Sequence, residues 1–199
     1  VGYSNKIYPN NIHDINKTCE TIIGDIRDFE KLKKSIQKFK PQILVHLAAQ
    51  PLVRESYVFP KETYETNLIG TLNVYEAVLT LESKCFLLSA TTDKVYFNKE
   101  QLWGYKETDR LGGQDPYSNS KSCVELMSYS YKHSFYNNSI HKLYTVRAGN
   151  VIGGGDWSKD RLIPDIIKSC HSNSSIELRN PSATRPWQFV LEPISGYLS

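Results

Sequence analysis

The chain has 199 residues, of which 40% are hydrophobic and 12% are aromatic, so it can fill the core of a globular domain and is not globally disordered. Its net charge of +3 is small and evenly spread, with no block of like charges beyond KLKK at 31–34. This charge distribution argues against a nucleic-acid-binding protein.

Four cysteines form no C-x-x-C pair and show no metal-ligand spacing with the five histidines. Cys85 lies in an apolar run and Cys123 in a helical pattern, which favours reduced thiols. We find no transmembrane run and no signal peptide, so we expect a cytoplasmic protein that binds neither a metal nor a membrane.

The first half of the chain alternates between strand and helix patterns. A short strand is predicted at 21–24, and Asp28 is a suitable N-cap for the helix that follows. That helix carries apolar residues three and four apart, at Phe29, Leu32, Ile36 and Phe39. The apolar run QILVHLAA at 42–49 predicts a strand buried on both faces.

After Pro60 a long helix is predicted, with apolar residues at Tyr64, Leu68, Leu72, Tyr75 and Leu79. CFLLSA at 85–90 is a second buried strand, and another helix begins near Pro116–Tyr117. LYTVRAGNVIG at 143–153 predicts one further strand with a glycine-rich exit. Beyond residue 156 or so the alternation weakens.

Repeated βα units predict an α/β fold, a Rossmann-like doubly wound parallel sheet. Such a sheet normally starts with a strand and a glycine-rich turn, but nothing before Thr21 supplies that turn. Gly153–Gly155 lacks the residues of a phosphate loop and is interpreted as a tight turn. Because VGYS at 1–4 is typical of a strand end, we expect an N-terminally truncated sheet whose first βα unit lies outside these residues.

Tyr117 and Lys121 form a Y-x-x-x-K pair, and a spacing of four places both on one helix face. A second pair, Tyr57 and Lys61, has Pro60 between its members and cannot lie in one regular helix. A tyrosine has a pKa of ~10, and a lysine ammonium one turn away lowers it by favouring the phenolate. The first pair is therefore the candidate for proton transfer.

Several motifs follow one another in order: GDIRD, HLAAQ, ETNLIGT, TTDKVY, DPYSNSK and RAGNVIG. Together they resemble the extended short-chain dehydrogenase/reductase family of NAD-dependent nucleotide-sugar enzymes. Within it, stretches such as TTDKVYFNKE and RNPSATRPWQFVLEPISGYL are similar to the 4,6-dehydratases that act on CDP-glucose. The resemblance implies NAD as cofactor, a nucleotide-sugar substrate and a homodimer. It also implies an NAD-binding domain at 1–152 and part of a smaller sugar-nucleotide-binding region at 153–199.

The resemblance implies a reaction in which Tyr117 takes the proton of the sugar 4-hydroxyl while hydride leaves C4. Water is then lost across C5 and C6, and hydride returns to C6. In this scheme Thr92 orients the 4-hydroxyl, Asp93 is the acid and Lys94 is the base. A free carboxylic acid (pKa ~3.9) and a free amine (pKa ~10.4) favour the opposite protonation states, so the last two roles require an unusual environment.

The resemblance also assigns binding residues. Cofactor contacts are implied for Asp25, Ile26, Ala48, Ala49, Tyr117 and Lys121. Substrate contacts near the diphosphate are implied for Asn150, Arg161 and Arg185. Lys6 stands near the position where the family usually has an acid for the adenosine ribose, so the NAD preference comes from the family alone.

Other polar and aromatic residues have structural interpretations. His46 is expected to be a hydrogen-bonded core histidine and Asn67 a brace between central strands. Trp103 and Trp187 either border the sugar-nucleotide site or pack. Tyr75 and Tyr131 are apolar positions that a dimer interface could use.

Two other functions stay open. An NAD-dependent epimerase of the same family would need no water-eliminating pair, so Lys94 after Asp93 favours dehydration. The chain could also be an inactive fragment that only binds a sugar nucleotide.

Overall fold

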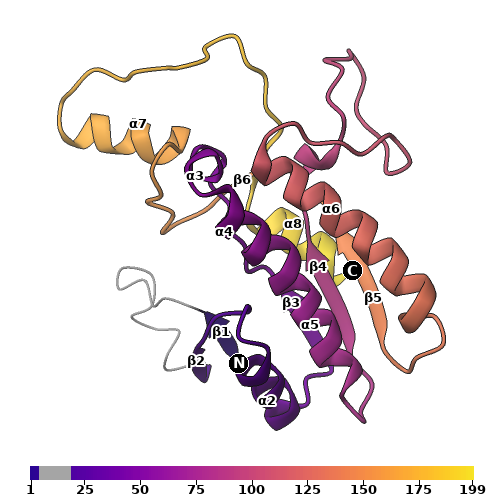
Figure 1. The fold of residues 1–199 in the computed structure, drawn as a ribbon. Coiled ribbons are helices and arrows are strands. Elements are labelled where there is room, and N and C mark those ends of the chain that lie inside the picture. The colour runs from indigo at the N-terminus through magenta and orange to yellow at the C-terminus, as the bar shows by residue number, and fades with distance from the viewer. Residues whose placement is uncertain (5–18) are drawn as a thin grey trace. The chain divides into compact units, whose positions relative to one another are not determined.

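The computed structural model describes residues 1–4 and 19–199, and Lys6 lies outside the described residues. The chain divides into two compact units, residues 1–147 and 148–199, which we call the N-terminal and C-terminal units. Both contain parallel strands and helices (Figure 1).

The N-terminal unit contains two parallel sheets. β1 (Gly2–Ser4) pairs with β2 (Thr21–Ile23), which confirms that the chain opens on a strand. β3 (Ile43–His46), β4 (Phe86–Ala90) and β5 (Lys142–Val146) form the second sheet in chain order. The predicted parallel α/β fold is therefore confirmed.

Helices connect these strands. α2 (Phe29–Phe39) begins as predicted after Asp28, whose side chain accepts a hydrogen bond of 3.1 Å from the Lys31 amide. In Figure 1, α4, α5 and α6 lie on one face of the three-stranded sheet. The other helical segments among the described residues of this unit are α3 (Val53–Val58), α4 (Pro60–Tyr64), the π-helical turn η1 (Glu65–Ile69), α5 (Gly70–Leu79), the 3₁₀ turn η2 (Asp93–Val95), α6 (Pro116–Tyr131) and the π-helical turn η3 (Lys132–Tyr136).

The core of the N-terminal unit includes two large tyrosines. Tyr75 is fully buried, its hydroxyl lies 2.7 Å from Ser128 Oγ, and the Tyr136 hydroxyl donates to the Tyr75 carbonyl at 2.8 Å. The expectation that Tyr75 and Tyr131 are spare positions is wrong, because Tyr131 packs against this core and donates its hydroxyl to Glu76 at 2.7 Å. Both side chains instead hold α5 and α6 together. Around them pack Ile26, Leu32, Ile36, Val74, Ala77, Val78, Leu81, Cys85, Leu87 and Leu143.

The prediction that the 42–49 strand is buried on both faces is wrong for β3. His46 is 5% exposed, but Ile43 and Val45 are 55% and 42% exposed. Successive side chains of a strand point to opposite faces, and the described helices between β3 and β5 cover one face only. β4 fits its prediction better, since Leu87, Leu88 and Ser89 are all buried.

The C-terminal unit contains β6 (Asn150–Ile152), α7 (Leu162–His171), β7 (Trp187–Phe189) and α8 (Leu191–Leu198), with β6 and β7 paired in parallel. The single strand predicted at 143–153 is therefore wrong: it breaks after Val146, and the second part pairs with β7. The turn at Gly153–Gly155 is confirmed, with Gly155 at a φ of +86°. Among the described helices, none has the length and apolar character needed to cross a membrane.

Candidate active site

Tyr117 and Lys121 lie on the first two turns of α6. The Asp115 side chain caps this helix by accepting a 2.9 Å hydrogen bond from the Ser118 amide. Tyr117 is 9% exposed and Lys121 is 4% exposed, and the Tyr117 amide donates to Ser56 Oγ at 3.2 Å. Both members of the pair are therefore fixed on one buried face of α6.

The second Y-x-x-x-K pair has a different setting. Tyr57 is 65% exposed on α3, whereas Lys61 lies on α4 and pairs with Glu65 at 3.6 Å. The two residues belong to separate helices, as Pro60 predicted.

Lys121 links α6 to the strand that precedes the Thr-Asp-Lys motif. Its Nζ donates to the Ala90 carbonyl, at the end of β4, over 3.0 Å. Burial lowers the pKa of Lys121 to about 8, while the Glu125 carboxylate acts in the opposite direction. Lys121 therefore carries its proton at neutral pH, and it supplies a positive charge on the helix face of Tyr117.

The Thr-Asp-Lys motif forms η2 directly after β4. Thr92 is 6% exposed, and its hydroxyl donates to Asp93 Oδ1 at 3.1 Å. Lys94 Nζ lies 3.7 Å from the same Asp93 oxygen, and both charged side chains are about one third exposed. Ser122 of α6 donates to the Val95 carbonyl at 2.9 Å. The structure therefore brings the two candidate catalytic motifs together through β4 and α6.

The residues expected to contact the cofactor follow β2 and β3. Arg27 holds the Asp25 carboxylate through Nε and Nη2, at 3.0 and 2.7 Å, and these hydrogen bonds lower the pKa of Asp25. Ile26 is 7% exposed, so its side chain belongs to the core. Ala48 and Ala49 are half-buried after β3. Ligands of such sheets bind beyond the carboxyl ends of the strands, and methyl side chains leave room there for a dinucleotide.

His46 has the structural role expected of it, whereas the contacts of Asn67 join a loop to a helix and not one central strand to another. His46 Nε2 lies 2.8 Å from Thr71 Oγ1, and burial, together with the nearby Lys121 charge, lowers the pKa of His46 to about 3, which keeps the ring neutral. Asn67 accepts from the Gln50 amide at 2.8 Å and donates to Ser120 Oγ at 2.9 Å. Asn67 thus joins the segment after β3 to α6.

The predicted substrate contacts all lie in the C-terminal unit. Asn150 begins β6, and its backbone N–H donates to the Pro186 carbonyl at 2.9 Å. Arg161 precedes α7, with its Nε 3.8 Å from an Asp156 carboxylate oxygen. Arg185 is exposed. Contact of these residues with a substrate stays a prediction.

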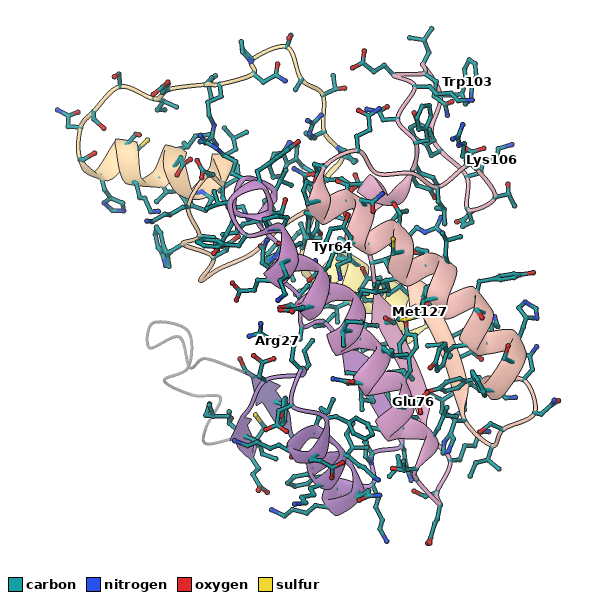
Figure 2. The ribbon with its side chains drawn as sticks, in the orientation of Figure 1. Arg27, Tyr64, Glu76, Trp103, Lys106 and Met127 are labelled. Atoms are coloured by element: carbon teal, nitrogen blue, oxygen red, sulfur yellow. The ribbon has the colours of Figure 1, made fainter. Side chains whose placement is uncertain are left out.

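The two tryptophans considered as border or packing residues are both open to solvent. Trp103 is 70% exposed in the loop after η2, where Figure 2 shows it away from α6, and Trp187 of β7 is 42% exposed. Neither side chain is part of a buried core.

Sequence reasoning missed Glu125 and Arg147. Arg147 directly follows β5 and binds the Glu125 carboxylate through Nε at 2.7 Å and Nη2 at 2.9 Å. Burial alone would raise the pKa of Glu125, but hydrogen bonds from Arg147 and Thr91 outweigh it and lower this pKa. The available signal was an acid one turn beyond Lys121 on the same helix face.

All four cysteines are free thiols. Among the described residues, no cluster of three or more histidine, cysteine, aspartate or glutamate side chains is arranged to hold a metal ion.

Comparison with known proteins identifies relatives over most of the chain. A family model described as GDP-mannose 4,6 dehydratase matches residues 1–198. CDP-glucose 4,6-dehydratase of Salmonella typhimurium is 53% identical over 189 residues, which cover 92% of this chain and 53% of that protein. CDP-paratose 2-epimerase of Salmonella typhi is 30% identical over 172 residues, which cover 78% of this chain and 50% of that protein. The chain spans about half the length of the curated relatives it matches.

Solved structures share the fold. A dTDP-glucose 4,6-dehydratase from Streptomyces venezuelae with NAD bound matches with a TM-score of 0.82 at 22% identity, over 94% of this chain and 55% of that one. A UDP-glucose 4-epimerase from Thermotoga maritima matches with a TM-score of 0.86 at 18% identity, over 98% of this chain and 63% of that one. At these identities the likeness shows the Rossmann-like fold alone.

Proposed function

The chain belongs to the GDP-mannose 4,6-dehydratase family, and we propose that its complete polypeptide dehydrates CDP-glucose to CDP-4-keto-6-deoxyglucose with NAD. One observation carries the proposal. Lys121, on the helix face of Tyr117, binds the end of the strand that leads into Thr92, Asp93 and Lys94. The pair proposed for oxidation, Tyr117 and Lys121, therefore shares one proposed site with the pair proposed for dehydration, Asp93 and Lys94.

Bound NAD would supply the hydride acceptor at C4 and the donor at C6. Ala48 and Ala49 would admit its backbone, and Asp25 would contact its adenine. Tyr117 takes the 4-hydroxyl proton. Bringing a phenol from pKa ~10 to neutrality takes roughly 4 kcal/mol of preference for the phenolate. The positive charge of the buried Lys121 ammonium stabilises the phenolate and is this chain's own contribution to that free energy.

The dehydration step uses the η2 segment. Thr92 orients the sugar 4-hydroxyl, Asp93 gives a proton to the departing hydroxyl, and Lys94 removes the C5 proton. As an ion pair at 3.7 Å, Asp93 and Lys94 carry the opposite charges to those needed. The proposed roles therefore require a proton to pass from Lys94 to Asp93 before elimination, between two side chains whose charged atoms lie 3.7 Å apart.

Three residues of the C-terminal unit would bind the nucleotide diphosphate: Asn150, Arg161 and Arg185. The planar guanidinium fork of arginine suits phosphate oxygens. Replacing Arg185 by alanine should raise the KM for CDP-glucose and change kcat little. A change confined to kcat would contradict a binding role.

The test is the mass of the product. The complete natural polypeptide, incubated with NAD and CDP-glucose, should release a sugar nucleotide lighter by one water. A product of unchanged mass with a new configuration would instead identify an epimerase. Tyr117→Phe should reduce turnover at least a hundredfold. The matched control Tyr57→Phe changes an exposed tyrosine and should leave turnover intact.

The same proposal includes a homodimer in the cytoplasm, where nucleotide sugars are made and used. Figure 2 shows Tyr64 on α4 and Met127 on α6; both are half-buried, and Met127 also packs against the core. We assign the dimer contact to α4 and α6. Met127→Glu should convert the dimer to monomer in sedimentation, whereas Lys34→Glu on α2 should not. A monomeric wild-type polypeptide would contradict the assignment.

A further inference from the structure

Among the described residues of the N-terminal unit, the most buried ion pair lies next to the candidate catalytic residues. The Glu125 side chain is 5% exposed and that of Arg147 is 17% exposed, and two parallel hydrogen bonds of 2.7 and 2.9 Å join them. The surface pair of Lys38 and Glu20 differs, because those side chains are 65% and 54% exposed. Replacing a buried ion pair by packed apolar residues is often neutral or stabilising, so stability alone does not explain this one.

The pair holds the chain at the entrance of the Thr92–Val95 segment. Thr91 donates its hydroxyl to Glu125 Oε1, and its amide donates to the Val146 carbonyl at 2.8 Å. One helical turn earlier, Lys121 holds the preceding residue, Ala90. Ala90 and Thr91, at the end of β4, are therefore bound by Lys121 and Glu125, which lie on two successive turns of α6 about 6 Å apart.

The pair also holds the chain at the exit of the same segment. Arg147 Nη1 donates to the Tyr96 hydroxyl at 2.9 Å, and the guanidinium carbon lies 5.0 Å from the Tyr96 ring centre. Tyr96 stacks on Tyr105, with ring centres 5.0 Å apart and planes within 16°. Hydrogen bonds to one ion pair therefore hold both ends of the segment that carries Asp93 and Lys94.

We propose that Glu125 and Arg147 are positioning residues that fix the Thr92–Val95 segment against α6 and so set the rate of water loss relative to oxidation. The inference rests on the proposed function. Oxidation takes place at C4 and elimination at the adjacent C5 and C6 of one sugar ring. Side chains on two separate elements must therefore reach neighbouring atoms, and a misplacement of about 1 Å can cost roughly a hundredfold in rate.

The experiment measures the two steps separately in one turnover. The complete natural polypeptide with bound NAD is mixed with CDP-glucose, and reduced nicotinamide is followed by absorbance. Samples are quenched for the dehydrated product. In Glu125→Gln we expect water loss to slow about 10- to 100-fold and oxidation to slow much less. Reduced nicotinamide should therefore accumulate above the wild-type level. Arg147→Lys, which keeps the charge but loses the fork, should change the ratio in the same direction.

Two conservative variants each remove one of these hydrogen bonds and leave the ion pair in place. Thr91→Val removes the entrance bond and Tyr96→Phe removes the exit bond, and each should shift the ratio of the two rates by several-fold. Glu20→Gln, in the surface pair, is the matched control and should leave the ratio unchanged.

The outcomes separate the inference from the proposed function. If the wild-type polypeptide neither reduces NAD nor releases water from CDP-glucose, the proposed function fails. If the wild type is active, the inference is overturned when both rates fall by the same factor in all four variants, as a loss of folded protein would produce. It is also overturned when the ratio does not change in Thr91→Val and Tyr96→Phe.

Discussion

Replacing Lys121 by methionine should stabilise the folded protein near neutral pH while abolishing turnover. Burial lowers the pKa of Lys121 from 10.5 to about 8. That difference corresponds to a cost of about 3 kcal/mol for holding the charged side chain in the folded state. Methionine removes the charge and keeps most of the apolar volume. It also loses the hydrogen bond to the Ala90 carbonyl, worth about 1 kcal/mol. We therefore expect a net gain of about 2 kcal/mol.

The gain must depend on pH in a defined direction. The folded-state pKa of Lys121 lies below that of an unfolded lysine, so between the two values the unfolded chain binds the additional proton. Raising the pH above about 8 therefore stabilises the wild type, and its difference from Lys121→Met should shrink toward pH ~10. Below about pH 8, Lys121 is protonated in both the folded and the unfolded state, so the folded wild type carries the full cost of burying this charge.

Urea unfolding of the complete polypeptide without ligands measures the effect, with wild type and Lys121→Met compared near pH ~7 and pH ~10. Lys38→Met is the control, because the Lys38 side chain is 65% exposed and no pH-dependent gain is expected there. A Lys121→Met protein that is less stable than wild type near neutrality, or a difference equal at both pH values, would refute the assigned burial cost.

Two further substitutions test the packing around the site. Asn67→Leu removes the acceptor of the Gln50 amide, so the free energy of unfolding should fall by about 2 kcal/mol in urea; an unchanged midpoint would contradict the bracing role. Gly113→Ala would place a Cβ 2.3 Å from the carbonyl carbon of Ser118, and a loss of about 3 kcal/mol is expected because backbone cannot rotate away. At Gly104 an added Cβ meets nothing within 4 Å, so Gly104→Ala is the matched control, and equal stability of the two variants would contradict the close contact.

Features governed by short-range chemistry could be predicted from the sequence. Asp28 caps α2 through a residue three positions away, and Pro60 separates α3 from α4. The spacing of Tyr117 and Lys121 places them on one helix face because α6 is regular there. In each case the cause lies within about one helical turn of the residue concerned.

Features governed by distant partners could not be predicted. Inside the run 143–153 only Gly149 is a local break signal, yet the strand already ends before Arg147, whose partner Glu125 lies 22 residues away. The sequence alone allows Tyr75 to lie at a dimer interface. In the structure, however, its hydroxyl is hydrogen-bonded to Ser128 of α6, which is 53 residues away in the chain.

The most direct test follows one deuterium atom. The complete natural polypeptide with bound NAD is given CDP-glucose that carries deuterium at C4, and the isolated sugar is analysed by mass spectrometry and NMR. If Tyr117 and Lys121 drive oxidation beside a dehydration pair, the product has lost one water and carries the deuterium at C6. A sugar that keeps its water, or a dehydrated product with the deuterium still at C4, would contradict the account.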